Sequence, residues 1–173
     1  MGCTLSGTGC IAIGRYPSGS SESVERLARL FSKSVVPCEI ETDIVTARWK
    51  KLLWNGPFTP ISVLGGGITT AEMIKSPSAV GLAVRVMEEI LILAEKTGHP
   101  IHRFIIEKIL ENTRTMTPSR TSMVQDYDRK LPMEVEAILG NTVRIAERNG
   151  VSVPYIESLY ALLKLVDAQN RSS

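Results

Sequence analysis

Apolar residues follow two different patterns along this chain, one typical of short strands and one typical of helices. Residues 10–14 are a short apolar run bounded by glycine, which is typical of a strand, and residues 37–41, Pro-Cys-Glu-Ile-Glu, resemble a second short strand. Between them, apolar residues recur every three or four positions over residues 20–34, where Ser20 or Ser21 can cap a helix. After Gly65-Gly66-Gly67 the pattern is almost wholly helical. It predicts a mainly α fold of several helices with a short β edge at the N-terminus.

Capping and breaking residues set the predicted helix ends. Asp43 caps a helix that reaches Asn55, where Gly56-Pro57 must break or kink it, because proline lacks the amide donor and clashes with the preceding turn. Thr69 and Glu72 have capping-box spacing, so a short helix is expected there. Further helices are expected over residues 103–114, 119–128, 135–149 and 155–169.

One long helix is expected to form the centre of the fold. It begins at Ser76-Pro77 and ends at Gly98, with Pro100 just beyond it. Its charged residues fall within an arc of roughly 120° on a helical wheel: Arg85, Glu88, Glu89, Glu95 and Lys96. Because nearly every other position is apolar, we expect this to be the buried central helix.

Composition narrows the classes of protein that remain. The 173 residues, 43% hydrophobic and 22% charged, suit a globular domain with its own core. A net charge of +2 is too balanced for an electrostatic nucleic-acid binder. The longest apolar run, residues 90–94, is far shorter than the about 20 residues of a membrane span. Three cysteines and no visible signal peptide favour a reduced, cytoplasmic location.

Two familiar motifs carry little weight here. Residues 7–12 match the GxGxxA dinucleotide fingerprint, but that motif needs a preceding strand and a following helix, and a strand-like run follows instead. His99 and His102 lack a clear third ligand, whereas zinc sites need three or four. We interpret the first as a chance match and the second as capping or surface residues, and we predict no metal site.

Five polar residues have ordinary structural interpretations when each is taken alone. Lys51 and Asn55 lie four apart, hence on one helical face, and the usual interpretation of Lys50-Lys51 is a solvated pair beside Trp49. Thr59 lies beyond the predicted break, so its alignment with the other two is less direct. Ser122 would ordinarily begin a helix, and Glu134 would ordinarily complement a helix dipole.

Taken in order, these residues resemble one family. Residues 49–55, Trp-Lys-Lys-Leu-Leu-Trp-Asn, resemble the Trp-x-Lys-Leu-x-x-Asn segment of ketopantoate reductases (2-dehydropantoate 2-reductases), and residues 121–126 resemble their Ser-Met-x-Gln-Asp segment. Glu134 and then Gly140, Ala146, Gly150 and Pro154 follow in the family's order. The resemblance covers about residues 9–165.

The resemblance implies both an activity and a domain arrangement. Family members reduce 2-dehydropantoate to pantoate with NADPH, toward pantothenate and coenzyme A. They join an N-terminal Rossmann domain to a helical domain resembling that of 6-phosphogluconate dehydrogenases, with the active site in the cleft between them. Residues 1–41 would then be the end of a nucleotide-binding domain plus a linker, and residues 42–173 the helical domain. NADPH would not bind tightly to this chain alone.

Site residues follow by position from the same resemblance. Lys51 matches the catalytic lysine, whose ammonium would stabilise and protonate the oxygen of a ketone under reduction. Glu134 matches an active-site glutamate that would orient the lysine or contact the cofactor ribose. Asn55 and Ser122 match substrate-binding residues. Thr59 replaces an asparagine that many members carry, so a related 2-oxo acid is an alternative substrate.

The expected partners are a small 2-oxo acid and either a Rossmann domain or a second copy of the chain, with no nucleic acid and no membrane. Two alternatives to the reductase interpretation remain open. One is a truncated, non-catalytic paralogue acting as a helical dimer or interaction module. The other is a domain of a related 2-oxo acid or 3-hydroxyacid dehydrogenase.

Overall fold

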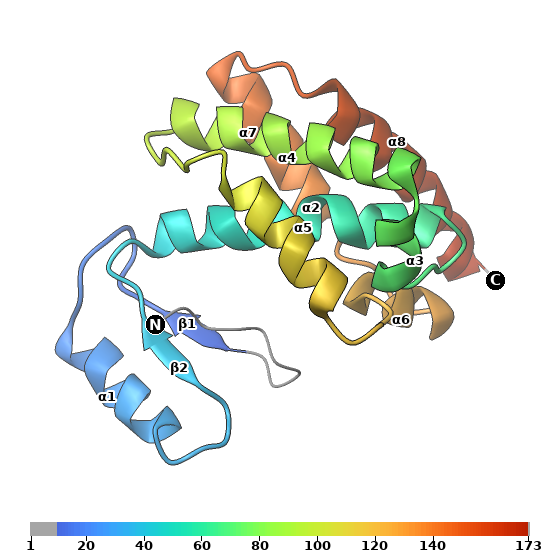
Figure 1. Ribbon diagram of the computed structural model, residues 1–173. Helices are drawn as coiled ribbons and strands as arrows, with labels where there is room; N and C mark the ends of the chain where they lie inside the picture. The colour runs from blue at the N-terminus through green and yellow to red at the C-terminus, as the bar shows by residue number, and fades with distance from the viewer. Residues whose placement is uncertain (1–9, 173) are drawn as a thin grey trace. The chain divides into compact units, whose positions relative to one another are not determined.

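The computed structural model describes residues 10–172 and confirms a mainly helical chain with a short β edge (Figure 1). In chain order its elements are β1 Ile11–Ile13, α1 Glu22–Phe31, β2 Cys38–Ile40, α2 Ile44–Leu64, α3 Thr70–Lys75, α4 Pro77–Lys96, α5 Ile105–Thr115, α6 Ser122–Asp128, the π-helix η1 Glu136–Gly140, α7 Asn141–Asn149 and α8 Pro154–Ser172. The chain forms two compact units, which meet inside α2 between Lys50 and Lys51. The glycines of the GxGxxA match lie outside the described residues.

The first unit is a single β-α-β motif. Its two strands pair in parallel, with Ile11 opposite Cys38 and Ile13 opposite Ile40. The cap predicted for α1 is confirmed, because the Ser21 hydroxyl accepts the Val24 amide at 3.3 Å. Among residues 10–50 only Trp49, on α2, is buried. Parallel sheets are ordinarily covered on both faces, so this motif has the character of a sheet fragment.

Gly56-Pro57, where a break or a kink is predicted, does not end the helix, because α2 continues to Leu64 with Pro57 and Pro60 inside it. A proline inside a helix costs about 3 kcal/mol. Packing offsets this cost: Leu53 and Phe58 are fully buried, and each such side chain contributes about 1.5–3 kcal/mol. Tertiary burial therefore overrides the local preference for a helix end.

The second unit is organised around α4, as expected, and α3, α7 and α8 pack against it (Figure 1). The apolar side of α4 is buried, with Val86, Met87, Ile90 and Leu93 all at 1% exposure or less. One residue of the charged arc is buried as well. Glu89 is only 6% exposed, because its carboxylate accepts the backbone N–H groups of Tyr155 and Ile156 at the start of α8.

Capping residues explain most of the remaining helix ends. The predicted capping box forms at α3, where the Glu72 carboxylate accepts the Thr69 amide at 2.7 Å. That backbone hydrogen bond holds the pKa of Glu72 below its usual value. Ser76 caps α4 as expected, and Gly150 ends α7 in the left-handed conformation at φ 62°.

The helix predicted over residues 135–149 is in fact the π-helix η1 followed by α7. The Arg144 guanidinium supports the wider turn by donating to the Glu136 carboxylate at 2.8 Å and to its carbonyl at 3.3 Å. Gly140 leaves room for this arrangement, because a Cβ there would lie 2.4 Å from Glu136 Oε2. Over residues 10–172, none of the helices has the length and apolar character that a membrane span requires.

Candidate functional site

Lys51 and Asn55 occupy one face of α2, as the four-residue spacing predicts. Lys51 is exposed and Asn55 is half-buried. The side chain of neither residue forms a hydrogen bond or ion pair within the described part of the chain. An ammonium and an amide are therefore presented together, with their donors and the amide acceptor open to a small molecule.

Thr59, one helical turn further along α2, is placed differently. It is 0% exposed, and its hydroxyl donates to the backbone carbonyl of Asn55 at 2.8 Å. The unbroken helix brings Thr59 into line with Lys51 and Asn55, which the predicted break would have prevented. Its hydroxyl hydrogen is used inside the helix, so Thr59 supports Asn55 from within the fold.

Ser122 and Glu134 lie at the start of α6 and just after it. Ser122 is the first residue of α6 and is exposed, whereas its neighbour Thr121 is the buried cap and accepts the Val124 amide. Glu134 lies between α6 and η1 with its side chain exposed, and its carbonyl accepts the Ile138 amide at 3.0 Å. Neither side chain is engaged by another residue in the part of the chain that is described. Both belong, with Lys51 and Asn55, to the second unit.

Sequence reasoning missed the polar residues that hold the start of α6 in place. Arg120 donates to the carbonyl of Gly67, in the turn after α2, and Thr70 exchanges hydrogen bonds with Ser119. The three consecutive glycines before α3 were the one signal available, since glycine runs often mark a turn held close to another segment. No spacing rule links that turn to a residue more than fifty positions later.

The N-terminus of α1 in the β-α-β motif is unfavourable for a pyrophosphate. A pyrophosphate needs free amides at a helix N-terminus, but Ser21 already caps α1, and Glu22 and Glu25 place negative charge in its first turn. No cluster of three or more His, Cys, Asp or Glu residues within residues 10–172 has the arrangement of a metal site.

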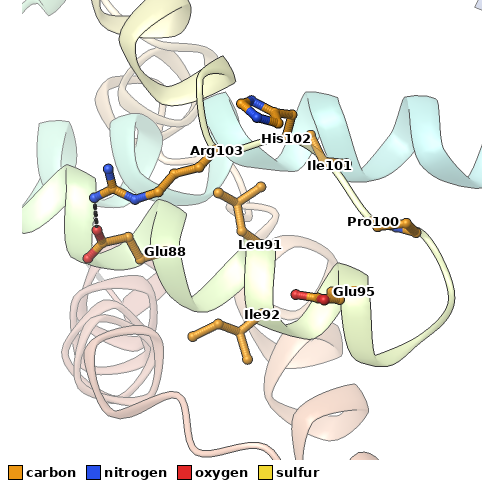
Figure 2. A pocket seen from close by; sticks show the side chains of 8 residues that line it. All are labelled: Glu88, Leu91, Ile92, Glu95, Pro100, Ile101, His102 and Arg103. Atoms are coloured by element: carbon orange, nitrogen blue, oxygen red, sulfur yellow. Dashed lines mark hydrogen bonds and ion pairs between the residues drawn. The ribbon is translucent and has the colours of Figure 1, made fainter.

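An open pocket of about 750 Å³ lies between α4 and the connection to α5. Figure 2 shows Arg103 extending from that connection to form an ion pair with Glu88 on α4. The lining residues are Glu88, Leu91, Ile92, Glu95, Pro100, Ile101, His102 and Arg103. None of the five site residues expected from the sequence lines this pocket, so it is separate from the Lys51 face of α2.

Comparison with solved structures supports the fold and the family together. The chain matches the 2-dehydropantoate 2-reductase of Methylococcus capsulatus with 40% identity and a TM-score of 0.88, covering 94% of this chain and 52% of that one. A dimeric ketopantoate reductase from Staphylococcus aureus matches with 25% identity and a TM-score of 0.78, covering 88% of this chain and 53% of that one.

Sequence relatives agree with the structural ones. A 2-dehydropantoate 2-reductase from Nostoc sp. is 35% identical over 169 residues, which are 95% of this chain and 53% of that protein. The chain therefore spans about half the length of the relatives it matches. The family model for the ketopantoate reductase PanE/ApbA C-terminal region matches residues 43–167. On these grounds the chain belongs to the ketopantoate reductase family and corresponds to its helical C-terminal domain.

Proposed function

We propose that this chain is the substrate-binding and proton-donating half of a reductase that converts 2-dehydropantoate to pantoate with NADPH. The observation that carries the proposal is that Lys51 and Asn55 lie together on an open face of α2, in a chain of this family. Ser122 and Glu134 lie in the same compact unit with their side chains exposed. The four residues supply a cation, an amide, a hydroxyl and a carboxylate.

Each group has a definite task in ketone reduction. Negative charge develops on the carbonyl oxygen as the ketone is reduced, and the Lys51 ammonium stabilises that charge and then donates a proton to the oxygen. The Asn55 amide can donate to the substrate carboxylate and accept from its hydroxyl group. Ser122 adds a hydroxyl to the substrate, and Glu134 orients the Lys51 ammonium or contacts the cofactor ribose.

The capped, acidic N-terminus of α1 is unfavourable for a pyrophosphate, which supports a nucleotide site in another domain. We propose that a nucleotide-binding domain supplies NADPH to the Lys51 face of α2. The length of the relatives supports this view, since the chain spans only about half of them. We also propose that the protein is cytoplasmic, as expected from the sequence.

Thr59 bears on the choice of substrate. Many family members carry an asparagine where this chain has Thr59, so a related 2-oxo acid is the alternative substrate. Because Thr59 is closed to solvent and bonded to the Asn55 carbonyl, we propose that it affects substrate choice through Asn55 and not by direct contact.

The adjacent lysines provide a matched test. In a chimera that joins the nucleotide-binding half of the Nostoc reductase to this chain, Lys51→Ala should lower kcat for 2-dehydropantoate by about a hundredfold or more. Lys50→Ala removes the same charge one position away, about 100° round the helix, and should leave kcat unchanged. Equal losses in the two variants would contradict the role of Lys51.

A non-catalytic interaction module is the second candidate. Its support is the exposure of large apolar side chains in the first unit, where Leu30 is 71% and Val35 is 89% exposed. Such a surface could bind a second copy of the chain in place of a nucleotide-binding domain. Activity of the chimera that depends on Lys51 would decide for the reductase.

A further inference from the structure

The segment that precedes Ser122 is hydrogen-bonded to the first residue of α3. The Thr70 amide donates to the Ser119 carbonyl at 3.1 Å, and the Ser119 amide donates to the Thr70 hydroxyl at 3.4 Å. These residues are far apart in sequence, so the start of α6 is fixed by tertiary contacts at its N-terminal side.

Arg120 adds a side-chain clamp at the same place. Its Nε and Nη2 atoms both donate to the Gly67 carbonyl at 3.2 Å, and its Nη1 atom pairs with Asp128 at the end of α6. Gly67 has φ +82°, and a Cβ there would lie 2.6 Å from Arg120 Nη2. The planar guanidinium thus joins two acceptor groups through three N–H donors, a geometry that a lysine ammonium cannot reproduce.

The turn that receives Arg120 is itself tied to α2. The Gly67 amide donates to the Ser62 carbonyl at 2.9 Å, and the fully buried Ser62 hydroxyl donates to the Ile68 carbonyl. A continuous set of hydrogen bonds therefore links the C-terminal end of α2, through the glycine turn, to Arg120. Arg120 directly precedes Thr121, the cap of α6.

We propose that Arg120 is a positioning residue that holds Ser122 at a fixed place relative to the Lys51 face of α2. The inference rests on the proposed function, because it treats Ser122 as a substrate-binding residue. The Arg120 side chain is 47% exposed and that of Asp128 is 40% exposed, so the ion pair between them adds little to stability. The value of the clamp lies in geometry, since small displacements of a binding group weaken the interaction with substrate.

The test is a double-mutant cycle in the Nostoc chimera with 2-dehydropantoate. Arg120→Ala should raise KM about tenfold with a smaller effect on kcat, and Arg120→Lys should recover little of the loss. The same Arg120→Ala change should have almost no effect on KM when Ser122→Ala is already present. An effect of equal size with and without Ser122 would overturn the inference, as would no effect at all.

Arg129→Ala is the matched control, because it removes the same charge at the other end of α6. The Arg129 side chain forms no hydrogen bond or ion pair to any residue in the described range, so KM should not change. A rise in KM equal to that of Arg120→Ala would show a general effect of charge and would overturn the inference that Arg120 positions Ser122.

Amide hydrogen exchange in the chain alone separates this inference from the proposed function. The Val124 and Gln125 amides bond to Thr121, so their exchange should accelerate in Arg120→Ala and stay unchanged in Arg129→Ala. If the wild-type chimera reduces no 2-oxo acid, the proposed function fails, and exchange alone then decides the inference. Unchanged exchange in Arg120→Ala would overturn it.

Discussion

The buried carboxylate of Glu89, midway along α4, accepts the backbone N–H of Ile156 in the first turn of α8 at 2.9 Å. A second bond from Tyr155, also at 2.9 Å, engages the other carboxylate oxygen. The first amides of a helix have no partners within it, and a negative charge is favourable at that end. One side chain therefore joins the central helix to the C-terminal helix and replaces a local cap.

The first prediction concerns the strength of this joint. Glu89→Ala leaves two amides without acceptors, so it should lower the free energy of unfolding by about 2 kcal/mol in urea denaturation. Glu95→Ala is the control on the same helix, because Glu95 is exposed, and it should change the free energy of unfolding by about 0.5 kcal/mol or less. Similar losses in both variants would show that Glu89 does not cap α8.

The second prediction concerns pH. Burial raises the pKa of Glu89, and this effect exceeds the opposing effect of the two backbone hydrogen bonds. The folded state therefore keeps the Glu89 proton to higher pH than the unfolded state does. Relative to Glu89→Gln, the free energy of unfolding of the wild type should fall as pH rises from the usual glutamate pKa through the raised one. A free energy of unfolding of the wild type that rises with pH relative to Glu89→Gln would contradict the raised pKa of Glu89.

The third prediction compares two helical glycines. A Cβ on Gly56 of α2 would lie 2.8 Å from Cδ1 of the buried Ile90, so Gly56→Ala should destabilise the fold by about 1–3 kcal/mol. Gly81 of α4 has open space around it, and Gly81→Ala should instead stabilise the fold by about 0.5–1 kcal/mol. Chemical denaturation checks both signs, and a stabilising Gly56→Ala would contradict the close approach of α2 and α4.

The fourth prediction concerns the exposed apolar residues of the first unit. Because Leu30 and Val35 have no apolar cover in the described structure, the 173-residue chain should self-associate in sedimentation velocity as its concentration rises. Leu30→Lys with Val35→Lys should weaken this association. Leu165→Lys, which alters an exposed leucine of α8, should leave it unchanged. A monomer at every concentration would contradict the prediction.

Local signals predicted most of the fold. Serine, threonine and glycine caps act within a few residues, so the helix starts at Ser21, Thr69 and Ser76 and the end at Gly150 followed from neighbouring positions alone. Helix α6 begins three residues later than predicted, because Thr121 and not a residue near Ser119 provides the cap.

The features that sequence could not predict depend on distant partners. The continuation of α2 through Pro57 and Pro60 depends on packing, and the burial of Glu89 depends on amides in another helix. The same holds for the site. Spacing placed Lys51 and Asn55 on one face, whereas the closed position of Thr59 and the clamp at Arg120 required the tertiary structure.

The most direct test of the account measures NADPH oxidation with 2-dehydropantoate by this chain alone and after mixing with the separately produced nucleotide-binding half of the Nostoc reductase. That half, mixed with its own helical domain, is the control for competent assembly. We expect no turnover by the chain alone and turnover in the mixture that disappears with Lys51→Ala. Turnover by the chain alone at the rate of a complete reductase would contradict the account, as would an inactive mixture when the control is active.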